Sequence, residues 1–224
     1  MGDESTLPAW KRKTAGENRF AAALAIVVAI VLQAVLPDRL AIRPVWILPV
    51  LEVGVLIGLI VINPVRISRP HPVARAGGLV LVGLIIAANV VSSVRLVHAI
   101  LDGHGSRDPN TLLGSGAAIY LTNVLGFALL YWEMDREGPI ARAGAHDPYP
   151  DFLFPQMTQE GLAPKDWEPT FVDYLYVSFT NATAFSPTDT LPLTVWAKLL
   201  MALQSAIALG VVALVIARAV NILG

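Results

Sequence analysis

The sequence has no cysteine, few histidines and few charged residues, and each of these deficits excludes a class of protein. Without cysteine, the chain has no disulfide and no thiolate metal site. The four histidines lie in separate segments without the HExxH spacing of zinc enzymes, so we expect no metal site. A net charge of −1 gives no basic excess, and we expect no nucleic-acid partner.

Sequence motifs of common enzymes are also missing. No Walker, Rossmann or nucleophile-elbow pattern occurs, and the glycine-containing segments do not follow a predicted strand, as a phosphate-binding loop would. No nucleophile, base and acid come together in the sequence as a catalytic set. We therefore expect neither an enzyme nor a bound cofactor.

Apolar residues are abundant instead. They make up 55% of the chain, the mean hydropathy is +0.61, and charged residues account for 15% against about 25% in a soluble domain. A bilayer core about 30 Å thick needs roughly 20 apolar residues of helix. The sequence predicts an all-α, multi-pass protein of the plasma membrane, with five transmembrane helices at residues 20–36, 45–62, 76–101, 112–132 and 199–217.

Polarity along the chain predicts its organisation. A polar N-terminal segment is followed by a four-span helical bundle, a proline-rich polar loop and a last apolar region. The loop is too polar to cross a membrane, and we expect it on the membrane surface, with Phe152, Leu153, Phe154 and Trp167 touching lipid or protein. The four regions are residues 1–19, 20–133, 134–170 and 171–224.

A short apolar segment follows the polar loop. Thr170 and Asp173 have the spacing of a capping box, which predicts a helix of about 13 residues over 171–183. A helix of this length is too short to cross a bilayer. Irregular backbone at membrane depth is tolerated only against protein or a water-filled cavity. We therefore expect one short re-entrant, pore-type helix.

The residues after this helix carry a resemblance. A short turn, Pro192 and then Trp196 and Lys198 lead into the last span, and this order resembles the pore module of potassium-type ion channels. The resemblance covers residues 112–222, so that 112–224 is expected to form one pore-like module with 112–132 as its outer helix. It implies a homo-oligomer, a tetramer in that family, that passes inorganic ions. The filter-like positions are Thr183, Ala184, Phe185, Ser186, Pro187, Thr188 and Asp189.

The centre of this segment departs from a potassium filter. Such a filter places two glycines where other residues resist the backbone angles, and this chain has Ser186 and Thr188 there, with Pro187 between them. We expect a channel-like pore-loop protein without potassium-type selectivity. At Asp189 and Thr190 two interpretations stay open, a cap for the last helix or a position near a pore mouth. The whole chain also resembles uncharacterised bacterial inner-membrane proteins that end in a similar "DFLYFSFT…SDT" segment.

Polar residues inside the predicted spans support other hypotheses. Glu52, Asn89, Asn123 and Gln204 fall within the apolar segments. An acid at the bilayer centre is costly, so Glu52 is expected to face the bundle interior. One hypothesis is a proton-linked small-solute transporter that uses Glu52 with Asn89 and Asn123. The alternative is hydrogen bonding that only holds the helices together, in a scaffold without transport.

The positions of basic residues predict an orientation that disagrees with the potassium-channel resemblance. Cytoplasmic loops carry an excess of Lys and Arg, which places the N-terminus inside. The resemblance, with five spans, places it outside. The N-terminal side carries Lys11, Arg12, Lys13, Arg19, Arg66, Arg69 and Arg75, and the other side carries Arg39, Arg43, Arg107 and Arg218.

Overall fold

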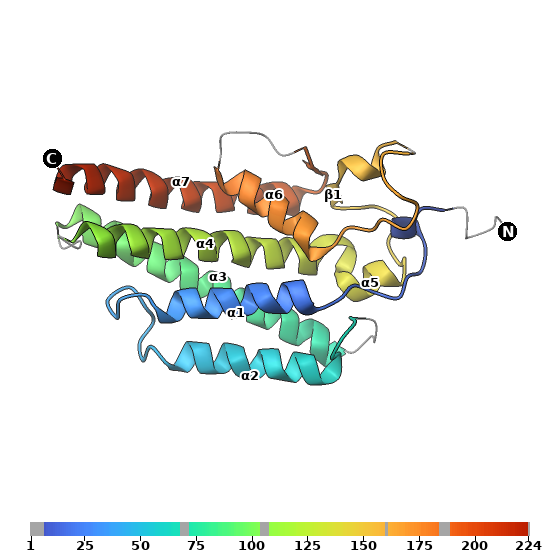
Figure 1. Ribbon diagram of the computed structural model, residues 1–224, viewed down its shortest axis with the longest axis horizontal. Coiled ribbons are helices and arrows are strands. Elements are labelled where there is room, and N and C mark those ends of the chain that lie inside the picture. Colours follow the sequence, from blue (N-terminus) through green and yellow to red (C-terminus); the bar gives the residue numbers. More distant parts are fainter. Residues whose placement is uncertain (1–6, 68–71, 104–107, 160, 184–188, 224) are drawn as a thin grey trace.

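The protein is an elongated bundle of helices with a cap of short elements at one end (Figure 1). The computed structural model describes residues 7–67, 72–103, 108–159, 161–183 and 189–223. The bundle helices are α1 (Phe20–Ala34), α2 (Ile47–Ile62), α3 (Pro72–Leu101), α4 (Pro109–Met134), α6 (Phe171–Thr183) and α7 (Val195–Leu223). The cap contains 3-10 turns at Ala9–Lys11, Asp135–Glu137 and Pro155–Met157, the helix α5 (Pro139–Ala143), and the strands β1 (Phe152–Leu153) and β2 (Leu191–Pro192).

Within the described part of the chain, three helices, α3, α4 and α7, are long and apolar enough to cross a membrane, which is consistent with a membrane protein. The helices α1 and α2 are apolar but have 15 and 16 residues. At 1.5 Å per residue they are about 22–24 Å long, less than the bilayer core of about 30 Å. The expectation of an all-α membrane protein is supported, whereas the number of five spans stays a prediction.

The long helices extend beyond the apolar segments that predicted them. Helix α4 begins at Pro109 because the side chain of Asp108 accepts hydrogen bonds from the N–H groups of Asn110 and Thr111 at 3.3 and 2.9 Å. Helix α7 begins at Val195 and continues past Arg218. Hydropathy therefore located the helices, while capping and polar extensions determine where they end.

Helix α4 lies at the centre of the bundle, where it contacts α1, α3, α6 and α7. Its glycines allow close packing. A Cβ at Gly116 would lie 2.9 Å from the side chain of Val215 on α7, and one at Gly126 would lie 3.2 Å from Ile86 on α3. The main apolar cluster contains residues from α1 to the start of α7, from Ala22 to Ala197, and the cap contributes to it. A second cluster lies at the other end of the bundle and includes Leu112 and Val215.

The polar loop forms an ordered cap. Strands β1 and β2 pair antiparallel, with Phe152 opposite Pro192. Phe152 and Phe154 are buried and contact aromatic rings of the bundle, including those of Tyr174 and Trp196. The two phenylalanines therefore contact protein. Pro192 precedes the last helix by three residues and lies in the strand pair.

Candidate functional site

Helix α6 enters the bundle at the capped end and stops partway along it (Figure 1). At its start, Phe171 packs edge-on against Trp132 near the end of α4, with ring centroids 6.1 Å apart. Near its other end, the side-chain amide of Asn181 donates to the carbonyl oxygen of Met201 at 2.9 Å. The chain then returns to the cap, where Leu191 pairs with Leu153. Helix α6 therefore has the length that the sequence predicts, while its re-entrant placement in a membrane stays a prediction.

The start of α6 is held by two carboxylates. Asp173 accepts from the backbone N–H of Thr170 at 2.7 Å, which is half of the predicted capping box. The hydroxyl of Thr170 donates to the same carboxylate instead of accepting from the Asp173 N–H. Glu17, from the segment before α1, accepts from the N–H of Phe171 at 2.5 Å and from the indole of Trp132 at 2.6 Å. Acids at this end also suit the positive end of the helix dipole.

The far half of α6 is held by a buried amide. Gln204 of α7 donates to the carbonyl and hydroxyl oxygens of Ser178 at 3.0 and 2.7 Å. Its own oxygen accepts from the hydroxyl of Tyr131 at 2.7 Å and from Asn181 at 2.8 Å. Ser178 in turn donates to the carbonyl of Val124 at 2.6 Å. Gln204 is fully buried and joins α4, α6 and α7 through these bonds.

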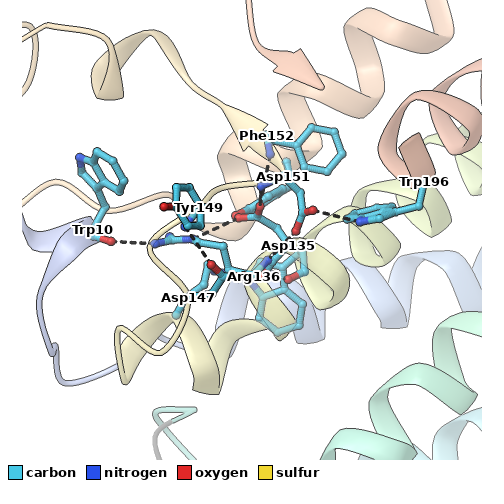
Figure 2. A network of polar contacts seen from close by, with 11 residues as sticks. Trp10, Asp135, Arg136, Asp147, Tyr149, Asp151, Phe152 and Trp196 are labelled. Carbon is cyan, nitrogen blue, oxygen red and sulfur yellow. Dashed lines mark hydrogen bonds and ion pairs between the residues drawn. The ribbon is translucent and has the colours of Figure 1, made fainter. Parts of the chain in front are cut away.

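A second polar network lies in the cap (Figure 2). Asp135 is fully buried and accepts from the N–H of Asp151 at 2.8 Å and from the hydroxyl of Tyr174 at 2.5 Å. Asp151 accepts from the indole of Trp196, at the start of α7, at 3.0 Å. Through these hydrogen bonds the two acids connect the end of α4 with the first half of α6 and with the start of α7.

Two arginines complete this network. Arg136 is 2% exposed; its guanidinium lies 3.7 Å from the Asp135 carboxylate and donates to the carbonyl of Trp10 at 2.7 Å. Arg142 donates to the carbonyls of Trp132 and Asp135 at 2.6 and 2.9 Å. Arg136 has φ of 46°, a left-handed conformation that is strained for a non-glycine residue. The hydrogen bond from its N–H to Asp151 at 2.9 Å helps to hold that conformation.

The acidity of Glu17 provides a prediction on pH. Burial raises its pKa above the ordinary 4.5, and the hydrogen bonds from Phe171 and Trp132 oppose this only in part. A carboxyl with a raised pKa binds its proton more tightly in the folded chain. Its contribution to stability is therefore present below pH 4.5 and is lost as the pH rises through the folded-state pKa.

Glu17→Gln is expected to flatten this part of the curve of stability against pH, measured by thermal unfolding of the purified protein. Trp132→Phe removes a hydrogen bond to the carboxylate but keeps the carboxyl, so it is expected to raise the folded-state pKa further and to make the total loss of stability larger. A curve that is unchanged by Glu17→Gln would contradict the assignment of this pH dependence to Glu17.

The predicted intramembrane polar residues fall into three groups. Glu52 is fully buried and accepts from the Gln33 amide at 3.4 Å, while its second oxygen has no hydrogen-bond partner among the described residues. Gly78 faces Glu133 and Gly126 faces Ile86, and this antiparallel register places Asn89 beside Asn123 at one level. The amides of both asparagines are buried without a hydrogen-bond partner in the described chain. Gln204 belongs to the α6 network instead.

The structure therefore brings some of the sequence-predicted residues together and separates others. Asn89 and Asn123 share a level, but no described hydrogen bond links Glu52 to either of them. Of the filter-like positions, Thr183 ends α6, where its hydroxyl donates to the carbonyl of Thr180 at 2.8 Å, and Asp189 is exposed. The interpretation of Asp189 or Thr190 as the cap of the last helix is wrong, because α7 begins only at Val195. The other predicted positions, Ala184, Phe185, Ser186, Pro187 and Thr188, lie outside the described residues.

Sequence reasoning missed the residues of the cap network. Asp135, Arg136 and Arg142 were part of a loop expected on the membrane surface, yet all three are buried. The available sequence signal for a buried network was the position of these charged residues between two aromatic segments, because the charged residues of a surface loop do not need aromatic neighbours. Comparison of the chain with protein-family models, with curated proteins and with solved structures gives no match.

Proposed function

We propose that the chain is the subunit of a channel-like, pore-loop membrane protein that passes inorganic ions without potassium-type selectivity. The observation that supports this most is the path of α6 between α4 and α7. Asn181 bonds Met201 and Gln204, about 14 Å along α7 from its start at 1.5 Å per residue, and residues 191–192 are again at the cap. A short helix that enters between an outer and an inner helix and returns is the arrangement of a pore loop.

The electrostatics of α6 favour cations. The C-terminal end of a helix carries a partial negative charge, and that of α6 lies partway along the bundle beside Met201 of α7. Helix ends of this kind coordinate cations in membrane transport proteins. Asp189, which is exposed just after the turn, adds a formal negative charge on the side of the cap. Selectivity by charge therefore fits this chain better than the carbonyl filter of a potassium channel.

An oligomer supplies the pore in this proposal. The outer face of α6 exposes Val172, Tyr176 and Phe179, and the outer face of α7 exposes Leu199 and Leu203. These faces are the surfaces that we assign to neighbouring copies, in a tetramer if the protein follows the channels it resembles. The proposal also places five helices, α1 and α2 included, across the plasma membrane, with the lipid bilayer around them.

Ion flux through the purified protein in liposomes tests the proposal. We expect cation flux with little preference between sodium and potassium, and almost none for chloride. Asp189→Asn should reduce the preference for cations over chloride, because it removes one negative charge per subunit near the pore mouth. Asp166→Asn, in an exposed part of the cap, is the matched control and should keep the preference. A folded oligomer that shows no ion flux above that of empty liposomes would contradict the proposal.

Glu52 favours a second candidate, a proton-linked transporter. A fully buried acid with one amide partner and one unpartnered oxygen, among the described residues, is costly unless it has a use. On this proposal, liposomes with the protein take up protons under an imposed membrane potential, and Glu52→Gln abolishes the uptake. Glutamine has nearly the same size as glutamate, so the Glu52→Gln side chain can still accept the hydrogen bond from Gln33. Equal proton uptake by the wild type and Glu52→Gln would exclude this candidate.

A further inference from the structure

A narrow cavity that opens to the surface lies between α1, α2, α3 and α4 at the capped end of the bundle, away from α6. Its walls are mostly apolar, from Ala22, Ala23, Ile26, Leu56, Leu59, Leu81, Val82 and Leu129. Ile26, Leu56 and Leu129 lie five or six positions inside the ends of α1, α2 and α4, so the apolar part extends roughly 9 Å along these three helices.

The polar lining of the cavity is gathered at its mouth. Arg19 directly precedes α1, Arg75 is in the first turn of α3, and Glu133 is next to the last residue of α4. The side chains of Arg75 and Glu133 are 35% and 13% exposed, so the mouth reaches the surface. An apolar cavity beneath charged groups, at the end of apolar helices, suits the binding of an amphiphile. The apolar chain of such a molecule would lie inside the cavity and its head group at the membrane–water interface.

The charges at the mouth do not balance. Arg75 donates to the backbone carbonyl of Glu133 at 2.8 Å and lies 3.9 Å from its carboxylate. Glu133 also interacts electrostatically with Arg19, and the Arg19 Nε atom is buried without a hydrogen-bond partner among the described residues. The charged residues that line the cavity are thus two arginines and one glutamate, which leaves one positive charge at the mouth. One anionic group would neutralise it, and guanidinium groups bind phosphate with paired hydrogen bonds.

Gly78 makes this arrangement possible. A Cβ at this position would lie 2.6 Å from a carboxylate oxygen of Glu133, so a larger residue here would require that side chain to shift away from α3. Glu133 therefore stays on the side of Arg75, and Arg19 is left as the group without a formal partner. The excess positive charge of the mouth therefore lies on the side of α1, which Arg19 precedes.

We propose that this cavity binds one acyl chain of an anionic phospholipid, with the lipid phosphate at Arg19 and Arg75. The inference uses the membrane placement of the proposed function but not ion passage. The juxtaposition of two arginines with an apolar slot selects an anionic head group over a zwitterionic one, because the added positive charge of a zwitterionic head group would lie near the same guanidinium groups.

Native mass spectrometry of the delipidated full chain in detergent tests this, with phosphatidylglycerol and phosphatidylcholine of the same acyl chains as probes. We expect phosphatidylglycerol to bind about tenfold more tightly, as for one charge-assisted contact. Arg19→Gln should remove that preference, while Arg39→Gln, an exposed position beyond the other end of α1, should keep it. Equal binding of the two lipids by the wild type would overturn the proposal.

A cavity-filling variant tests the acyl-chain part. Ala23→Leu adds bulk to the wall of the cavity and should weaken phosphatidylglycerol binding at least tenfold. Ala34→Leu makes the same change at an exposed position and should bind as the wild type does. If Ala23→Leu does not fold, as judged by thermal unfolding without lipid, Ala23→Val gives the same test. The proposal would be overturned if the folded variant bound phosphatidylglycerol as the wild type does. It would also be overturned if the wild type bound a free fatty acid but no phosphatidylglycerol. Absent ion flux would leave it standing.

Discussion

Asp135→Asn is expected to destabilise the protein by about 3–5 kcal/mol, as the removal of one partner from a buried ion pair does. Asparagine keeps the size of the side chain but loses the charge that faces Arg136 at 3.7 Å. In the wild type, the two carboxylate oxygens of Asp135 accept hydrogen bonds from Asp151, Phe152 and Tyr174. Asparagine replaces one of these oxygens by an NH2 group, which can only donate. Thermal unfolding of the purified protein, followed by circular dichroism, measures the loss.

The matched control for this substitution is Asp166→Asn, an exposed aspartate of the same cap. Surface substitutions of this kind change stability by about 0.5 kcal/mol or less. A similar effect for the two variants would contradict the assignment of the Asp135 network as the anchor of the cap. Because Trp196 bonds Asp151, the Asp135→Asn variant should also loosen the start of α7.

Gln204→Leu is expected to cost about 2–3 kcal/mol, because it removes four hydrogen bonds and leaves the Tyr131 hydroxyl buried without an acceptor. Leucine is close to glutamine in volume, so packing is largely kept and the loss comes from hydrogen bonding. On the proposed function, this variant also lowers ion flux, because α6 is no longer held against α7. Flux and thermal unfolding of the same preparation measure both effects.

Leu209→Ala is the control for this second variant, since Leu209 is an exposed residue of α7 that is not among those assigned to neighbouring copies. It should retain the stability and the flux of the wild type to within the scatter of surface substitutions. A loss of about 0.6 kcal/mol or less for Gln204→Leu, the average for one interhelical hydrogen bond in a helical membrane protein, would contradict this prediction.

Much of the helical framework could be predicted from the sequence because apolar runs are long and clearly interrupted. The segment over 171–183 is a helix of the predicted bounds, since the capping residues Thr170 and Asp173 mark its start. The cap could not be predicted. Its order depends on contacts between residues far apart in the chain, such as Arg136 with Trp10, and no local period records them.

In the candidate site, too, the sequence predicted single polar residues but not their partners from other helices. Gln204 was recognised as a polar residue within a span, but its partners Tyr131, Ser178 and Asn181 come from two other helices. Depth along the helices correctly placed Asn89 at the level of Asn123, because the two helices share a short connection and run antiparallel. Glu52 was correctly expected to face the bundle interior, whereas its partner Gln33 depends on how α1 and α2 cross.

The central claim is that α6 enters and leaves the membrane on one side. The chain has no cysteine, so single cysteines can be introduced without a background. Leu162→Cys precedes α6, Asp189→Cys follows it, and Asp102→Cys lies at the other end of the bundle, all at exposed positions. With an impermeant maleimide, we predict that positions 162 and 189 are labelled from the same side of the membrane and position 102 from the opposite side. Labelling of 162 and 189 from opposite sides would contradict the account.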